Sequence, residues 1–328
     1  MGTSSKSQTA TSSTRDVSRF RWFVGMCIAS VFSLVYLVAP VYILTCIISL
    51  AFQYPTRNIA IGYSLPMIVS AIVPSISTPR LSWLLNPMLD YFDYNEEFEL
   101  DNEAFRVEAA KGKRFIIAIQ PHGVISFVGL CSWVSAPPDF RRVKTAVASA
   151  LLLTPILKHV MGIFGLTDAS ASNLRRHLKN EGVDGCIVIY TGGLAEMFKS
   201  CHEEERLYLK KRKGFIKLAL REGVDVVPAY FFGNTSVLTL FKAGPLGALS
   251  RKLQVSLTYF WGKWNLPIPR DDMLLYVRGK PLGIPHIPNP SKEDVDTWHA
   301  KYVEEVTRLF YKYNEKLPSY KHKKLFID

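Results

Sequence analysis

The segment QPHG at residues 120–123 is the first place in the chain where residue types and spacing suggest chemistry. It follows a strand-like apolar run at 114–119. Pro121 fixes the exit of the chain, and Gly123 permits a tight bend with close approach of the backbone. In a parallel α/β sheet this turn lies at the carboxyl end of a strand, where ligands bind. His122, with an unperturbed pKa of about 6.5, could act there as a general base, or it could simply cap the turn.

A second candidate turn follows another strand-like run, at residues 186–190. Gly192 and Gly193 free the backbone, and Glu196 follows where a helix should begin. Glu196 could orient the imidazole of His122 or hydrogen-bond a reacting hydroxyl. Glycine pairs are common in turns, so this segment alone is a weak indication of a site.

A third candidate is a cluster of basic residues ahead of the helical pattern GFIKLAL. Cations at a helix start oppose the helix dipole, so an anionic partner would relieve the conflict. Arg212, Lys213 and Lys217 are the candidates to bind the phosphates of a cofactor. Attraction to anionic lipid headgroups explains the same charges equally well.

Several familiar catalytic motifs are absent from the sequence. It has neither a G-x-S-x-G nucleophile elbow, nor a phosphate-binding G-x-x-x-x-G-K-[ST] loop, nor a dinucleotide-binding G-x-G-x-x-G. The seven histidines lack zinc-ligand spacing, so we expect no metal. The five cysteines are odd in number and form no C-x-x-C, which favours a reducing compartment without disulfides.

The elements that must position these turns alternate between strand and helix. Near-continuous apolar runs predict buried strands at 114–119, 186–190 and 224–232. Residues 145–165 and 170–181 read as helices. Ser291 with Asp294 forms a capping box that opens a long amphipathic helix. The pattern predicts an α/β fold with a mostly parallel sheet flanked by helices.

The composition is both apolar and basic. Of the 328 residues, 48% are hydrophobic and 21% charged, yet the formal net charge is +12. This combination favours a protein of a membrane surface or one that binds anionic ligands. Zinc-finger spacing, basic helices with heptads and aromatic RNA-binding motifs are all missing, so we expect no nucleic acid partner.

The first third of the chain is typical of a membrane segment. No charge interrupts residues 23–52, and a second apolar run covers 59–76. We expect a disordered cytosolic N-terminus at 1–21, a membrane-embedded helical hairpin at 22–77 and a cytosolic α/β domain at 78–328. The alternative is that the first run bends back at Pro40 while the second lies in the membrane interface.

Taken together, these blocks resemble the type-2 diacylglycerol acyltransferase family, which includes monoacylglycerol and wax-alcohol acyltransferases. The resemblance runs from the hydrophobic hairpin to the last amphipathic helix. Four blocks carry it: PHG at 121–123; GG with Glu196; RKGFIKLAL followed by VVPAYFFG; and LYVRGKPLGIP at 275–285. Their order and spacing make the combination fairly specific.

The resemblance implies an acyl-CoA-dependent enzyme that esterifies diacylglycerol to triacylglycerol, without a cofactor beyond acyl-CoA as co-substrate. His122 matches the family's active-site histidine, whereas Gln120 replaces the first histidine of the usual His-Pro-His-Gly block. Thr191 and Asn234 are further departures. The resemblance implies an endoplasmic reticulum membrane, with lipid droplets as a second location and a homo-oligomer left open. The alternatives are another acceptor (monoacylglycerol, a fatty alcohol or a sterol) or a catalytically silent membrane scaffold.

Overall fold

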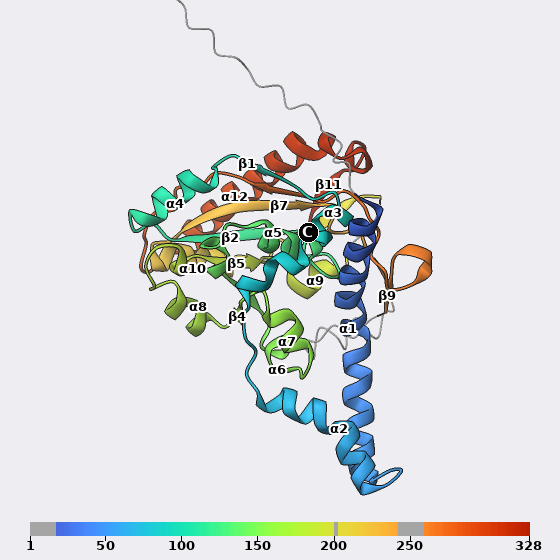
Figure 1. Cartoon of the computed structure of the whole chain (residues 1–328). Helices are drawn as coiled ribbons and strands as arrows, with labels where there is room; N and C mark the ends of the chain where they lie inside the picture. Colours follow the sequence, from blue (N-terminus) through green and yellow to red (C-terminus); the bar gives the residue numbers. More distant parts are fainter. Residues whose placement is uncertain (1–17, 200–202, 242–258) are drawn as a thin grey trace, which may run out of the picture.

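The computed structural model describes residues 18–199, 203–241 and 259–328. Its centre is a seven-stranded sheet in which neighbouring strands run parallel except for one pair (Figure 1). In spatial order the strands are β1 (Asn95–Phe98), β10 (Leu275–Arg278), β7 (Asp225–Phe232), β2 (Phe115–Gln120), β5 (Ile187–Tyr190), β3 (Lys144–Val147) and β4 (Leu166–Asp168). The predicted α/β class with a mostly parallel sheet is confirmed.

Strand β2 occupies the middle of the sheet because both of its faces are apolar. All six of its residues are buried. Ile117 and Ile119 face a layer that contains α1 (Arg19–Phe52), α3 (Pro87–Tyr91) and α5 (Phe127–Ser135). Ile116 and Ala118 face α8 (Ala171–His177), α10 (Gly214–Glu222) and α12 (Lys292–Tyr313). The period-two alternation of a strand thus builds two hydrophobic cores, one on each face.

Helix α12 confirms the sequence prediction at its start. The Ser291 side chain accepts a hydrogen bond from the backbone N–H of Asp294, and the Asp294 carboxylate accepts one from the backbone N–H of Ser291, which completes the capping box. Tyr302, Val306 and Leu309 on the apolar face are fully buried against the sheet.

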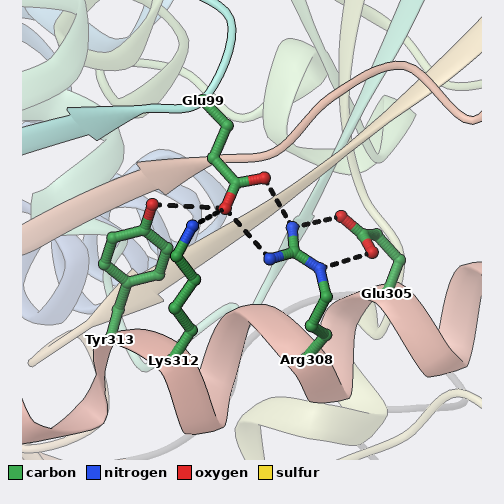
Figure 2. Close-up of polar contacts among 5 residues, drawn as sticks. All are labelled: Glu99, Glu305, Arg308, Lys312 and Tyr313. Atoms are coloured by element: carbon green, nitrogen blue, oxygen red, sulfur yellow. Dashed lines mark hydrogen bonds and ion pairs between the residues drawn. The ribbon is translucent and has the colours of Figure 1, made fainter.

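A polar cluster fixes the other face of α12 to the sheet edge (Figure 2). Glu99, which follows β1, accepts hydrogen bonds from Arg308, Lys312 and Tyr313, and Arg308 also binds Glu305. Burial alone would raise the pKa of Glu99, but the hydrogen bonds from Arg308 and Lys312 outweigh it and lower the pKa to about 2. The cluster therefore consists of paired charges that hold two elements together.

The predicted helix at 145–165 is wrong at its start and broken in its middle. Residues Lys144–Val147 form β3, which pairs with β5, and only then do α6 (Ser149–Leu153) and α7 (Leu157–Gly162) follow. The short apolar run suits either structure in isolation, and pairing with β5 decides for the strand. Pro155 cannot donate a helical hydrogen bond, so it separates the two helices.

The remaining elements are short and lie around the sheet. Within the described residues they include α4 (Asn102–Ala110), α9 (Gly193–Met197) and several 3₁₀ helices, of which Pro79–Leu85 is the longest. Two small sheets complete the fold: β6 (Glu205–Leu207) with β11 (Leu325–Ile327), and β8 (Thr239–Leu240) with β9 (Phe260–Trp261).

The N-terminal half of α1 packs on α3, and its C-terminal half projects from the domain beside α2 (Arg57–Ile72) (Figure 1). Two hydrogen bonds join the helices: the Tyr42 hydroxyl donates to the backbone oxygen of Tyr63, and the hydroxyls of Thr45 and Tyr63 are bonded to each other at 2.8 Å. α1 is one helix that continues through Pro40, so the chain does not fold back there. Their outer faces are apolar and exposed at Val38, Val41, Leu44, Ile47, Ile59, Ile61, Leu65 and Ile72.

This helix pair indicates a membrane-associated protein. Within the described residues, α1 alone is long and apolar enough to cross a membrane, and α2 has 16 residues where about 20 are needed. The segment 1–17, most of the N-terminus that the sequence predicts to be disordered, lies outside the described residues.

Candidate active site

The turn after β2 carries the candidate base. Pro121 follows a cis peptide bond, and the chain then bends at Gly123 with φ +66°. A Cβ at Gly123 would lie 2.5 Å from the backbone oxygen of Asn234, so only glycine fits this approach. The turn leads directly into α5, and it therefore holds His122 at the carboxyl end of the central strand.

Asn234, which lies just after the neighbouring strand β7, holds this turn in place. Its side-chain amide donates to the carbonyl oxygens of Pro121 (3.0 Å) and His122 (2.8 Å), and it lies 3.3 Å from Oγ of Ser126. Its Oδ1 accepts from the N–H of Val128 at 3.3 Å. Asn234 is 1% exposed. The sequence marked it as a departure from the family pattern and as the first residue of an N-glycosylation sequon, Asn234-Thr235-Ser236. Its position just after a buried strand was the signal that it belongs to the site.

The imidazole of His122 is set in one tautomer. Its Nδ1 lies 2.8 Å from the carbonyl oxygen of Gly123. Because a carbonyl oxygen can only accept, Nδ1 carries the hydrogen and Nε2 keeps its lone pair. None of the described residues hydrogen-bonds to Nε2. Burial lowers the pKa of His122, although the bond to Gly123 opposes this, so the ring is neutral at pH 7.

Glu196 supports the turn through its backbone. One carboxylate oxygen accepts the N–H of His122 at 2.6 Å, and the other accepts the N–H of Tyr208 at 3.2 Å. The carboxylate does not hydrogen-bond to the imidazole, so it positions the chain that carries the ring. Burial raises the pKa of Glu196 to about 7, against the opposing effect of the two N–H donors. A Cβ at Gly192 would lie 2.3 Å from this carboxyl group, and Gly193 has φ +57°.

The basic residues of the third candidate are separated in space. The guanidinium of Arg212 lies 5.2 Å above the ring of Tyr208, next to the Glu196 carboxylate. Lys213 is paired with Asp296 of α12 at 2.6 Å. Lys217 is exposed on α10, in the helix layer on the other face of the sheet. Of the three, the structure brings Arg212 to the site.

Gln120 points away from the imidazole, into the core beneath α12. Its side-chain oxygen accepts from the hydroxyls of Tyr302 and Thr191 (3.3 Å for Thr191). Its Nε2 is buried and has no hydrogen-bond partner among the described residues. Gln120 thus supports the sheet edge and does not contact the reacting atoms.

A cavity of about 90 Å³ lies between the sheet and α5. Its wall combines apolar residues, among them Ile117, Ile119, Trp133 and Phe231, with the charged side chains Glu96 and Arg278. Tyr190 also lines it, and the Tyr190 ring packs edge-on against the imidazole with 5.1 Å between ring centroids. The Tyr190 ring therefore borders both the imidazole and the cavity.

Residues 18–199, 203–241 and 259–328 contain no group of three or more His, Cys, Asp or Glu side chains placed to hold a metal ion. Among the described residues, the geometry brings together an imidazole with a free lone pair on Nε2, a buried carboxylate and a nearby cavity.

Comparison with known proteins adds a family. A family model described as "Diacylglycerol acyltransferase" matches residues 52–328. Diacylglycerol O-acyltransferase 2 of Homo sapiens is 28% identical over 62% of this chain and 58% of its own length. The Danio rerio protein of that name is 28% identical over 61% of each chain, and 2-acylglycerol O-acyltransferase 3 of Homo sapiens is 29% identical over 63% of this chain and 67% of its own. The first two matches thus span about three fifths of the relatives' length.

Among solved structures, the 1-acyl-sn-glycerophosphate acyltransferase PlsC from Thermotoga maritima aligns with 88% of this chain and 97% of its own. The TM-score is 0.43 and the sequence identity is 11%.

Proposed function

Because the chain belongs to the diacylglycerol acyltransferase family, we propose that it transfers a fatty acyl group from acyl-CoA to the free hydroxyl of diacylglycerol and forms triacylglycerol. The observation that carries the proposal is the state of His122. Its Nδ1–H is bonded to the carbonyl oxygen of Gly123, which leaves Nε2 as an acceptor at the carboxyl end of the central strand.

In the proposed mechanism, Nε2 of His122 removes the proton from the acceptor hydroxyl as the oxygen attacks the thioester carbon. The tetrahedral intermediate then collapses, the carbon–sulfur bond breaks and the CoA thiolate takes the proton from the imidazolium. General-base assistance of this kind contributes about 10²–10⁴-fold to a rate. The carbonyl oxygen of Gly123 supports the imidazolium, because it accepts a hydrogen bond from Nδ1–H in both protonation states.

Glu196 acts in this mechanism through the protein backbone. Its carboxylate holds the N–H of His122, so it sets the position of the turn and thereby of the imidazole. Asn234 holds the carbonyl side of the same turn. Held from both sides, the ring is preorganised and loses little entropy when the acceptor binds.

The acyl chain is assigned to the cavity beneath α5. The thioester carbon must lie near Nε2, and the Tyr190 ring borders both that position and the cavity. About 90 Å³ is well below the roughly 300–1,000 Å³ of sites that enclose a whole ligand, so the cavity holds a segment of the chain. The guanidinium of Arg212 is the retained candidate for the phosphates of coenzyme A, because Lys213 is already paired.

The acceptor is assigned to the membrane beside α1 and α2. Each buried methylene contributes about 0.8 kcal/mol, so a diacylglycerol with two acyl chains stays in the bilayer. The exposed apolar faces of the two helices would anchor the domain there, with residues 78–328 on the cytosolic side of the endoplasmic reticulum membrane or on lipid droplets.

A second acceptor class is supported by the relatives. The human 2-acylglycerol O-acyltransferase 3 is as similar to this chain as diacylglycerol O-acyltransferase 2. Monoacylglycerol is therefore the alternative acceptor for the same chemistry, ahead of a fatty alcohol or a sterol.

Membranes that contain the full chain, supplied with labelled oleoyl-CoA and a panel of alcohols, test the proposal. We expect triacylglycerol from diacylglycerol as the main product, at least about 10²-fold less product from His122→Ala, and unchanged product from the exposed control His286→Ala. Faster esterification of monoacylglycerol would select the alternative acceptor. Retained activity of His122→Ala would remove the imidazole from the mechanism, and no ester from any alcohol would favour a silent scaffold.

A further inference from the structure

The Glu196 carboxylate receives its two hydrogen bonds from separate parts of the chain. One donor is the N–H of His122, and the other is the N–H of Tyr208, 12 residues beyond Glu196. Tyr208 directly follows β6 (Glu205–Leu207). Strand β6 is not part of the large sheet. The position of Tyr208 therefore depends on the contacts that β6 makes elsewhere.

Strand β11 holds β6 in a parallel pair, with Leu325 opposite Glu205 and Ile327 opposite Leu207. Asp328 extends this pairing on both sides of Tyr208. Its N–H donates to the oxygen of Leu207 at 2.8 Å, and its backbone oxygen accepts the N–H of Leu209 at 2.9 Å. The backbone around Tyr208 is thus fixed by the residue that follows β11.

The side chain of Asp328 contacts the segment that follows α9, the helix that carries Glu196. The Asp328 carboxylate lies 2.6 Å from Nζ of Lys199, which follows α9. The N–H of Lys199 in turn bonds to the backbone oxygen of Glu196 at 2.8 Å, and its ammonium lies 5.3 Å above the ring of Tyr208. Asp328 therefore links the helix that carries Glu196 to the segment that donates to it.

We call the segment from Lys323 to Asp328, with its contacts to Lys199 and β6, the clasp. A buried ion pair provides its second attachment to β6. Lys323, just before β11, lies 3.3 Å from the carboxylate of Glu205, and both side chains are almost fully buried. The same carboxylate accepts from the hydroxyl of Thr235 at 2.6 Å, next to Asn234. The segment from Lys323 to Asp328 is consequently attached to all three parts of the site: the α9 end, the β6 end and the end of β7.

We propose that Asp328 is a positioning residue of the active site, which holds the Tyr208 N–H against Glu196 and, through Glu196, the backbone of His122. This inference rests on the proposed acyl transfer, because it assigns the purpose of the clasp to that reaction. Loosening the clasp would move the turn that carries the imidazole without touching the substrate.

The pH dependence of the reaction reports on this clasp. The charged and titratable groups that face Glu196 come from several elements: His122, Glu205 of β6, Arg212, Tyr230 of β7 and Tyr302 of α12. The Tyr208 N–H favours the ionised carboxylate, so weakening this hydrogen bond would raise the pKa of Glu196 further. The acid limb of the activity profile would then move to higher pH.

The test compares Asp328→Ala with Asp139→Ala in the full chain, using labelled oleoyl-CoA and diacylglycerol from pH 5.5 to 9. Asp139 is the matched control, because it forms a surface ion pair with Arg106 at 2.8 Å. Asp328→Ala keeps the backbone hydrogen bonds to Leu207 and Leu209 and removes the carboxylate that pairs with Lys199 and Arg206. We expect it to move the acid limb upward by about half a pH unit and to lower activity at pH 7 by roughly three- to tenfold. Asp139→Ala should leave both unchanged, and Asp328→Glu should restore most of the activity.

Lys199→Met provides a second route to the same clasp. It should reproduce the shift, and the double variant should add little to it, because both changes remove the Asp328–Lys199 ion pair. Hydrogen exchange of residues 203–210 gives a readout that needs no activity, and we expect it to become faster in Asp328→Ala.

If the acid limb of the pH–activity profile does not move in Asp328→Ala, the positioning role is overturned. Unchanged hydrogen exchange of residues 203–210 in this variant would overturn it too. An activity loss equal at every pH, with a matching loss of thermal stability, would reduce Asp328 to a structural residue and overturn it as well. A wild-type protein that makes no ester would count against the proposed function, and the exchange data would then still show whether the clasp holds Tyr208.

Discussion

Replacing Glu196 by Gln should make the stability of the protein less sensitive to pH. Burial raises the pKa of this carboxyl group from 4.5 to about 7 in the folded chain. Between those two values the unfolded chain has released the proton and the folded chain keeps it. A rise in pH through this window therefore favours unfolding of the wild type.

The size of the effect follows from the pKa difference. One pKa unit corresponds to about 1.4 kcal/mol, so the difference between 4.5 and about 7 corresponds to about 3 kcal/mol. The wild type should lose about this much stability between pH 4.5 and pH 8 on account of Glu196. Gln cannot ionise, so Glu196→Gln should not show this loss. Gln has one acceptor oxygen, so its NH₂ group would face one of the two backbone N–H donors, and that hydrogen bond would be lost. The loss costs about 1–3 kcal/mol of unfolding free energy, and this cost is the same at every pH.

Urea unfolding of the detergent-solubilised protein at pH 4.5, 6 and 8 measures the effect. The unfolding free energy of Glu196→Gln minus that of the wild type should increase by about 3 kcal/mol from the lowest pH to the highest. The exposed Glu304→Gln is the matched control, and it should follow the wild type at each pH. A difference between Glu196→Gln and the wild type that stays constant from pH 4.5 to 8 would refute the reasoning. It would mean that burial does not raise the pKa of Glu196, and the geometry of the turn would need another explanation.

Three further predictions concern the same turn. Gly123→Ala should reduce esterification more than tenfold, because φ is +66° and a Cβ would meet the backbone of Asn234; normal activity would argue against the close approach. Asn234→Ala should lower the unfolding free energy by about 1–3 kcal/mol, because it leaves the buried carbonyl oxygens of Pro121 and His122 without a donor; urea unfolding measures this, and an unchanged midpoint would contradict it. The sequon at Asn234 should stay unmodified, because its side chain is buried and hydrogen-bonded; a glycosidase-sensitive mass shift would place this face in the lumen.

The sequence predicted the parts of this protein that depend on local pattern. The apolar run ahead of His122 is a buried strand, and Ser291 with Asp294 begins a helix, because periodicity and capping act over a few residues. The surroundings of Gly123 and Gly192 explain why both are glycine, because a Cβ would clash with Asn234 at the first position and with Glu196 at the second. The candidate pair His122 and Glu196 was chosen from two separate turns, and the fold brings them into contact.

Other features required the tertiary structure. The run at 144–147 reads equally well as a helix start, and only pairing with β5 makes it a strand. Arg212, Lys213 and Lys217 look like one cluster in the sequence. In the fold, Lys213 is paired with Asp296, and α10 begins at Gly214 and carries Lys217 away from the other two. Short-range pattern carries no information about which partner a side chain meets across the sheet.

The chemistry of the site was thus set by residue type, whereas its geometry was set by strand order. The sequence by itself determined an imidazole and a carboxylate at two strand ends, and a membrane-associated apolar segment before them. Only the fold decided that Glu196 binds the backbone of His122, 74 residues away, and that Asn234 clasps the turn from 112 residues away. The physical reason is that the order β7-β2-β5 brings three distant carboxyl ends to one edge, where hydrogen bonds of about 3 Å can form between them.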